Sequence, residues 1–148
     1  MHYPFKKILC PIQFEDSDQT ALMLASQIAK HMDATIYLLN VVIMMQAVDA
    51  PDGAVAANKS VEDDARLKLQ AIAAEKLAAL KAEILTRVAP PGETSKVVLE
   101  VATETDTDLI VLNTHGRHGL AHFVMGSVAE QIVRRAICAV LTLTSTAT

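Results

Sequence analysis

The chain has 148 residues, of which 51% are hydrophobic and 20% charged, and its formal net charge is −4. This length and apolar content suit one globular domain and exclude a disordered chain, whose apolar residues are too few to offset chain entropy. The scattered basic residues and the 3% aromatic content offer neither a phosphate-binding patch nor stacking platforms for nucleic acid. We therefore expect a single domain over residues 1–148 with no nucleic-acid partner.

The apolar stretches and the cysteines indicate the cellular compartment of the protein. The stretch 36–45 contains Asn40 and is too short to span a bilayer. Residues 1–7 lack the hydrophobic region of a signal peptide. Cys10 and Cys138 lie in apolar runs, which suit packed, reduced thiols better than a disulfide. We expect a cytoplasmic protein with no membrane partner.

Apolar runs alternate with helical patterns along the chain, which is typical of a parallel sheet with helices on both faces. Residues 7–14 predict a first strand, and Asp16 and Ser17 offer caps to the helix that follows. Residues 34–42 predict a second strand. Residues 44–59 have no stable period and predict a long, mobile loop that could act as a flap.

The second half of the chain continues this alternation. Ser60 and Asp63 have the spacing of a capping box, and the apolar positions of the helix they begin run as far as Ile84. A weak third strand overlaps the end of this helix at 84–88. The remaining expected elements are a helix over 95–105, a strand over 108–112, a helix over 127–135 and a strand over 138–144.

The segment 113–130 carries the clearest chemical signal. In a parallel α/β sheet, ligands bind beyond the carboxyl ends of the strands where the strand order reverses, which here predicts lips at 11–14 and 113–119. Glycines at 116, 119 and 126 allow close approach of backbone to a ligand, and Ser127 and Glu130 have capping-box spacing at a helix start. Such a start attracts anions, so a phosphate group is the expected occupant.

The same segment resembles the universal stress protein family. Members carry G-x-x-G, nine residues and then G-S or G-T between the fourth strand and the fourth helix. This chain has N-x-x-G-x9-G-S, in which Gly116, Gly126 and Ser127 match and Asn113 replaces the first glycine. Asparagine readily adopts the left-handed conformation, which would preserve the turn.

The opening run KILCPIQF is similar to the family's first strand. There an aspartate that accepts a hydrogen bond from the adenine amino group usually stands at the position of Gln13. A glutamine carbonyl can accept the same bond. The resemblance covers essentially the whole chain.

The resemblance implies a five-stranded parallel sheet in the order 3-2-1-4-5 and an adenine nucleotide, ATP or AMP, with Mg²⁺ as the partner of a triphosphate. It implies a role in stress response or signalling. The fifth strand, AVLTLTST, would lie at an edge of this sheet and is rich in β-branched residues and uncharged, so we predict a homodimer through this C-terminal strand. The contacts it implies are Pro11, Gln13 and Val41 for the base, Leu112, Asn113, His115 and Gly116 for ribose and phosphates, and Gly126, Ser127 and Val128 for the phosphate tail.

Two other interpretations stay open. The chain could be a nucleotide-independent dimeric interaction protein of the same fold, in which the glycines only form turns and Ser127 only caps a helix. A zinc site at His115, His118 and His122 is disfavoured because glycines interrupt any helix there and no carboxylate or thiolate adjoins them. We therefore expect no metal site.

Common enzyme classes lack their motifs in this sequence. There is no P-loop, no G-x-G-x-x-G after the first strand and no G-x-S-x-G elbow. A response-regulator receiver would need an acceptor aspartate at the end of the third strand, where residues 88–90 are Val, Ala and Pro. We expect no catalytic residues, and at most slow hydrolysis of ATP.

Overall fold

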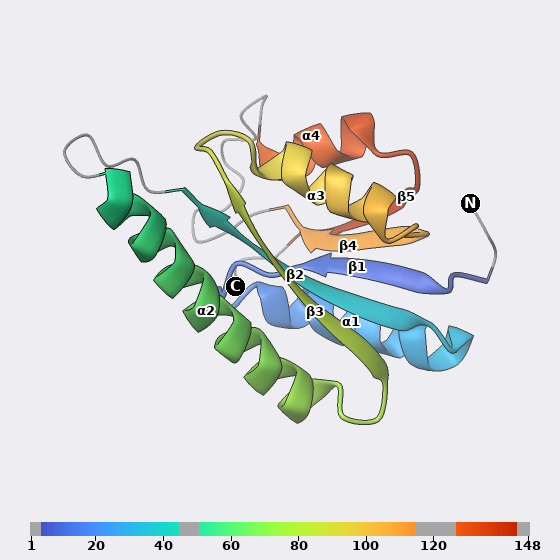
Figure 1. The fold of residues 1–148 in the computed structure, drawn as a ribbon. Coiled ribbons are helices and arrows are strands. Elements are labelled where there is room, and N and C mark those ends of the chain that lie inside the picture. Colours follow the sequence, from blue (N-terminus) through green and yellow to red (C-terminus); the bar gives the residue numbers. More distant parts are fainter. Residues whose placement is uncertain (1–3, 45–50, 115–126, 145–148) are drawn as a thin grey trace.

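The computed structural model describes residues 4–44, 51–114 and 127–144 as one parallel sheet with helices on both faces (Figure 1). The strand order is β3-β2-β1-β4-β5, which confirms the expected order. The elements are β1 (Lys7–Pro11), α1 (Asp18–Met32), β2 (Thr35–Ile43), α2 (Pro51–Lys76), β3 (Lys81–Ala89), α3 (Thr94–Glu104), β4 (Leu109–Asn113), α4 (Val128–Arg135) and β5 (Ala139–Leu143). Within the described residues, no helix has both the length and the apolar run needed to cross a bilayer.

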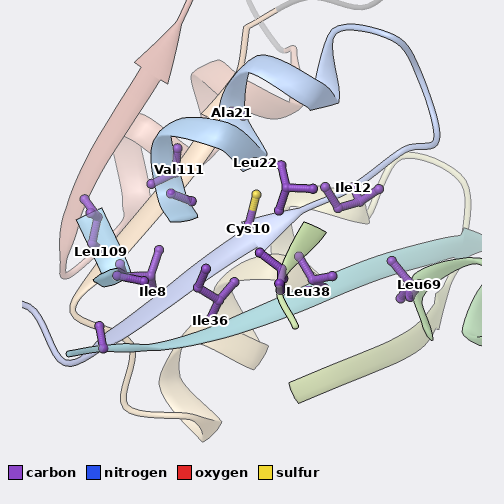
Figure 2. Close-up of a cluster of buried hydrophobic side chains, with 14 residues drawn as sticks. Ile8, Cys10, Ile12, Ala21, Leu22, Ile36, Leu38, Leu69, Leu109 and Val111 are labelled. Carbon is purple, nitrogen blue, oxygen red and sulfur yellow. The ribbon is translucent and has the colours of Figure 1, made fainter. Parts of the chain in front are cut away.

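Two hydrophobic cores lie on opposite faces of the sheet, because successive side chains of a strand point to opposite sides. In β1, Ile8 and Cys10 join the cluster beneath α1 and α2, whereas Leu9 joins the cluster beneath α3 and α4. Figure 2 shows the first cluster, in which Cys10 points from β1 toward Leu22 of α1. Burial raises the pKa of the Cys10 thiol to about 12, so the expectation of a packed, unreactive thiol is confirmed.

Helix α2 begins much earlier than the sequence pattern predicts. The chain is helical from Pro51, so the expected loop over 44–59 and the expected cap at Ser60 are wrong from that residue on. Proline suits the first helical turn because its φ is preset and its missing N–H would have no partner there. The alanine-rich stretch that follows Gly53 has high helix propensity, which outweighs the single glycine. Residues 45–50 lie outside the described part of the chain.

The end of α2 also differs from the expectation. The helix ends at Lys76, and Ile84, which the pattern assigned to the same apolar stripe, lies within β3. The N–H of Leu80 donates to the carbonyl of Leu77 at 2.9 Å in the intervening turn. Strand β3 then pairs with β2 over nine residue pairs. Short apolar runs fit either period, and the long-range pairing decides between them.

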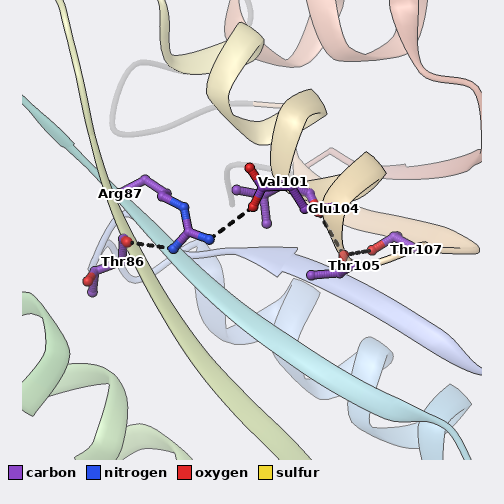
Figure 3. Close-up of polar contacts among 6 residues, drawn as sticks. All are labelled: Thr86, Arg87, Val101, Glu104, Thr105 and Thr107. Atoms are coloured by element: carbon purple, nitrogen blue, oxygen red, sulfur yellow. Dashed lines mark hydrogen bonds and ion pairs between the residues drawn. The ribbon is translucent and has the colours of Figure 1, made fainter.

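Polar contacts dock the end of α3 onto the sheet (Figure 3). Arg87 of β3 forms an ion pair with Glu104, with 3.0 Å between Nη2 and Oε2. The hydroxyl of Thr105 donates to the carbonyl of Val101 at 2.8 Å and lies 2.7 Å from the hydroxyl of Thr107. The ion pair links the last turn of α3 to β3, and the threonine contacts hold the turn that leads into β4. The first turn of α3 lies at the carboxyl ends of the strands, where Thr94 lines a cavity together with the ends of β1 and β4.

Leu69 offers a test of how α2 is held. Its side chain is fully buried, whereas that of Leu67 in the same helix is 64% exposed. We expect Leu69→Ala to lower the free energy of unfolding by about 2–5 kcal/mol through lost burial and a residual cavity. The matched control Leu67→Ala should change it by less than about 0.5 kcal/mol. Urea titrations followed by circular dichroism measure both; equal effects would mean that α2 does not pack on the sheet as described.

Candidate functional site

A cavity of about 480 Å³ opens at the carboxyl edge of the sheet. It lies between the ends of β1 and β4, where the strand order reverses. Its described walls come from the β1–α1 segment, the second half of β2, the end of β4 and the first turns of α3 and α4. Both the location and the volume are typical of small-molecule sites, which measure roughly 300–1,000 Å³.

Most of the residues implied by the family resemblance meet in this cavity. Those in its walls are Pro11, Gln13, Val41, Leu112, Asn113, Ser127 and Val128. His115, Gly116 and Gly126 lie outside the described residues, so their implied contacts remain predictions. The fold thus brings the predicted site segment 11–14 together with residues 113 and 114, which are the described part of the predicted segment 113–119.

Two asparagines anchor the ends of the β1–α1 segment. The amide Nδ2 of Asn40, a buried residue of β2, donates to the carbonyl of Ile12 at 2.7 Å. The N–H of Ile12 donates in turn to the carbonyl of Leu39 at 2.8 Å. At the other end, the side-chain amide of Asn113 donates to the carbonyl of Ser17. The segment is thereby attached to both strands that flank β1.

Asn113 does not adopt the left-handed conformation that the sequence suggested. It is the last residue of β4, is paired with Leu143 of β5, and is not among the described residues with positive φ. Its place at the end of a ladder favours extended backbone over the glycine-like turn. The side chain instead bridges toward α1 at one wall of the cavity.

The middle of the β1–α1 segment is a strained turn. Phe14 has φ of 62°, a conformation that costs a bulky side chain about 1–3 kcal/mol. The carboxylate Oδ2 of Asp18 accepts hydrogen bonds from the N–H groups of Gln13 and Glu15, each at 2.9 Å. The Nζ of Lys68 lies 5.2 Å from the centre of the Phe14 ring. Contacts from α1 and α2 thus hold this turn.

At the start of α1 the bonded side chain is that of Asp18, and it accepts from N–H groups that precede the helix. Ser17 occupies the N-cap position of α1 with helical backbone angles and forms no side-chain capping bond, so the expected cap at Asp16 or Ser17 is wrong. Burial raises the pKa of the Asp18 carboxyl, and the nearby Glu15 carboxylate raises it further. The N–H groups of Glu15, Gln13 and Phe14 act in the opposite direction and lower it. Glu15 and Asp18 are the charged residues among the described walls of the cavity.

The first turn of α4 forms the opposite wall. Ser127 is an extended N-cap residue whose Oγ accepts a hydrogen bond from the N–H of Glu130 at 3.2 Å, which confirms the expected cap. Val128 and Ala129 follow it in the cavity wall. The first N–H groups of a helix have no partner within the helix and carry its positive dipole end, so this turn is suited to an anion.

A short contact fixes the position of α4 against α3. The hydroxyl of Ser95, which is buried, donates to Oε1 of Gln131 at 2.5 Å. Glu130 pairs with Arg134 one turn along α4, with 2.9 Å between Oε1 and Nη2. The capped end of α4 is therefore held by its own side chains and by its neighbour helix.

Sequence reasoning missed several residues of this site. Asp18 was overlooked because residues that cap the helix were sought at the start of α1, whereas its carboxylate bonds to N–H groups ahead of the helix. Asn40 was noted only as a polar interruption of an apolar run; a buried polar residue in a central strand needs a partner, and that need was the available signal. Thr94, which also lines the cavity, had no recognisable signal.

The zinc hypothesis falls on residues beyond the described part of the chain. Its three histidines, at 115, 118 and 122, are all there. Within 4–44, 51–114 and 127–144, no group of three or more His, Cys, Asp or Glu side chains is arranged to hold a metal ion.

Comparisons with known proteins agree with this architecture. Residues 4–143 match the model of the universal stress protein family. The chain is 33% identical over 142 residues to Universal stress protein MJ0531 of Methanocaldococcus jannaschii, covering 93% of this chain and 81% of the relative. It is 30% identical over 142 residues to Universal stress protein A homolog 2 of Coxiella burnetii, covering 93% of each.

Solved structures share the fold at lower identity. The structure of hypothetical protein MJ0577 superposes with a TM-score of 0.83 at 21% identity, covering 97% of this chain and 99% of that one. A universal stress protein in complex with cAMP gives 0.63 at 22% identity, with 96% and 98% covered. A family protein of Arabidopsis thaliana with AMP bound gives 0.65 at 19% identity, with 96% and 93% covered.

The raised pKa of Asp18 predicts a pH-dependent effect of its replacement. The folded protein holds the Asp18 proton more tightly than the unfolded chain does, so ionisation costs stability as pH rises from the ordinary value of 3.8 through the folded value. Asp18→Asn removes this cost. The unfolding free energy of the variant relative to wild type should therefore increase across that interval and level off above it.

Urea titrations at a series of pH values measure this difference. Asp16→Asn is the matched control, because Asp16 is exposed and lies two residues away. A relative stability of Asp18→Asn that fell with rising pH would show that the bonds from Gln13 and Glu15 outweigh the burial of the carboxylate.

Proposed function

This chain belongs to the universal stress protein family, and from that premise we propose that it binds an adenine nucleotide, AMP or ATP, in the cavity between β1 and β4. The observation that carries the proposal is the meeting of an apolar strand wall and a capped helix start on opposite sides of one cavity. A nucleotide needs both, since its base is flat and largely apolar and its phosphate is anionic.

The base would lie against the β1 and β2 side. Pro11 and Val41 supply apolar wall there, and Gln13 lines the cavity beside them. The Gln13 carboxamide carries both a donor and an acceptor, which matches the adjacent amino group and ring nitrogen of adenine. Buried apolar contact would supply affinity and the carboxamide would supply selectivity.

The phosphate would lie at the start of α4. The hydroxyl of Ser127 can donate to a phosphate oxygen while its own oxygen accepts from Glu130. The N–H of Val128 is the first of the helix, where the dipole favours negative charge. Hydrogen bonds of this kind to a charged group contribute roughly 1.5–3 kcal/mol each.

The charge of the cavity bears on the number of phosphates. The described walls carry Glu15 and Asp18 and no lysine or arginine, so each added phosphate charge meets repulsion from this side. AMP is therefore favoured over free ATP, and ATP would bind with a divalent cation such as Mg²⁺ that screens its phosphates. Binding of AMP and cAMP by structural relatives supports a ligand of low charge.

The fifth strand would join two copies of the chain. Among the described strands β5 pairs with β4 alone, so its other edge carries unpaired backbone groups, and all five of its residues are half-buried. Ile137, just before it, is 86% exposed, and Val133 of α4 is also exposed. An uncharged edge beside exposed apolar side chains favours pairing with a second copy about a two-fold axis.

In this proposal nucleotide occupancy alters a surface that a partner recognises during stress. The alternative, a nucleotide-independent dimeric interaction protein, keeps the β5 edge and leaves the cavity without a ligand. Small molecules released from freshly purified protein and identified by mass spectrometry distinguish the two, since an adenine nucleotide is expected only from the first.

Substitutions at Ser127 separate phosphate binding from helix capping. Ser127→Ala should weaken AMP about tenfold, because one charge-assisted bond is lost, and should cost about 1 kcal/mol of stability through the lost cap. Ser127→Asp keeps a capping oxygen but adds a negative charge, so it should retain stability and lose AMP binding. Ser127→Thr keeps the hydroxyl and should bind as wild type does.

Isothermal titration calorimetry with AMP measures these affinities, and thermal unfolding reports the cap. Undiminished AMP binding by Ser127→Asp would exclude the start of α4 as the phosphate site. A wild-type protein that binds neither AMP nor ATP with Mg²⁺ would leave the interaction protein as the function.

The dimer is tested with Thr142→Lys, which puts a charge into the middle of β5. Lysine on an edge strand opposes pairing between sheets, so the variant should be largely monomeric where the wild type has the mass of two chains. Gln70→Lys, at an exposed position of α2, is the matched control and should remain dimeric. Light scattering coupled to size-exclusion chromatography gives the masses, and a monomeric wild type at micromolar concentration would contradict the proposed interface.

A further inference from the structure

We propose that Asp18 is a positioning residue of the cavity: its carboxylate holds the turn at 13–15 in the shape that receives the base, and ligand affinity falls when this carboxylate takes up a proton. The inference rests on the proposed function and adds to it a residue that the family resemblance did not assign. It makes ligand affinity depend on pH.

The turn needs an external hold because its backbone is strained. Phe14 has φ of 62°, in the left-handed region that bulky residues avoid. The N–H groups on either side of it, those of Gln13 and Glu15, both donate to the same carboxylate oxygen of Asp18. Bonds to a charged acceptor are roughly twice as strong as neutral ones. The shape of the rim therefore depends on the charge of Asp18.

Other contacts hold the ends of the segment and not its middle. Asn40 bonds to the carbonyl of Ile12, and Asn113 bonds to the carbonyl of Ser17. Both are neutral amides, so neither changes with pH. Between these two anchors the turn can change shape while the rest of the fold stays intact.

The groups that face Asp18 favour uptake of a proton. Burial is the main cause of its raised pKa, and the carboxylate of Glu15 adds to it. Beneath it, the thiol of Cys10 in β1 has a pKa of about 12 and is neutral in this range. Lys68 of α2 lies over the Phe14 ring at an exposed position, where solvent screens its charge. Asp18 thus changes charge at a higher pH than an exposed aspartate does.

Protonation would lower affinity through the population of the competent turn. The carbonyl oxygen of a neutral carboxyl can still accept from both N–H groups, but it binds them more weakly than a carboxylate does. The turn then spends less time in the shape that receives a base, and the apparent dissociation constant rises in inverse proportion to that fraction. Global stability moves in the opposite direction, because the neutral form avoids the cost of a buried charge.

Asp18→Asn separates these two effects. Asparagine has the shape of a protonated aspartate and carries no charge. The variant should therefore be more stable than wild type at neutral pH and yet bind ligand more weakly. A residue with a merely structural role would shift stability and affinity in the same direction.

The experiment measures binding of AMP and of adenosine by calorimetry from mildly acidic to neutral pH. Wild-type affinity for both probes should rise with pH to a plateau. Asp18→Asn should show no such rise and bind roughly three- to tenfold more weakly than that plateau. Asp18→Ala should bind more weakly still, and Asp16→Asn should follow the wild type.

Adenosine carries no phosphate, so it separates the hold on the turn from charge repulsion. If Asp18→Asn binds adenosine as tightly as wild type at neutral pH, the proposal is overturned. The same holds if it binds AMP more tightly, since Asp18 would then act by repelling phosphate.

A ligand-free measurement keeps this inference distinct from the proposed function. In ¹H–¹⁵N spectra the amide signals of Gln13 and Glu15 should titrate with one shared midpoint in wild type and should not do so in Asp18→Asn. If wild type binds neither probe, the proposed function fails, and a shared midpoint would still establish that Asp18 holds the turn. Absence of that midpoint would overturn the inference whatever the binding result.

Discussion

The central position of β1 is the constraint on which the rest of the structure depends. This strand pairs in parallel with β2 on one side and with β4 on the other, and its side chains enter both hydrophobic cores. A strand paired on both edges and covered on both faces has to be apolar and regular. The chain leaves β1 toward one face of the sheet and leaves β4 toward the other. The connections therefore diverge at the carboxyl ends of these two strands, and a cavity forms there.

The cavity wall contains features that cost stability elsewhere in a protein. Phe14 is held in a left-handed conformation, and Asp18 is a carboxylate whose burial outweighs the bonds it accepts. Strained backbone and perturbed charges persist where the surrounding structure holds them, and they often mark functional sites. Here Asp18 and Lys68 contact the strained turn itself, and Asn40 and Asn113 anchor the two ends of the segment. The strained residue, the buried carboxylate and the two anchoring hydrogen bonds all lie within the segment 12–18.

The carboxyl edge and the lateral edge of the sheet differ in the kind of partner that they favour. At the carboxyl edge, the cavity beyond the ends of β1 and β4 is lined by apolar strand residues and by the first turn of α4. This combination favours a small anionic ligand. At the lateral edge, β5 presents backbone groups and apolar neighbours, which favours another protein chain. In the proposed function one fold would combine a ligand site with an association surface, and α4 would contribute to both, because its first turn lines the cavity and its last turn leads into β5.

Local patterns determined much of this protein. The alternation of apolar runs with helical stripes predicts each strand and the helices α1, α3 and α4 to within a few residues, because side-chain periodicity depends on near neighbours. The cap at Ser127 was equally local, since its partner Glu130 is three residues away. The strand order and most of the cavity residues came from the resemblance of the chain to a known family, above all in the segment 113–130 and the opening run KILCPIQF.

The tertiary structure alone decided the remainder, because it arises from contacts between distant residues. Strand β3 replaced the end of the expected helix because β2 offered a full-length partner. Asn113 was drawn into the end of β4 and toward Ser17, which lies 96 residues away along the chain. Asn40 found its buried partner in the carbonyl of Ile12, which lies 28 residues away along the chain. Short-range periodicity carries no information on such meetings, because they are set by the packing of whole elements.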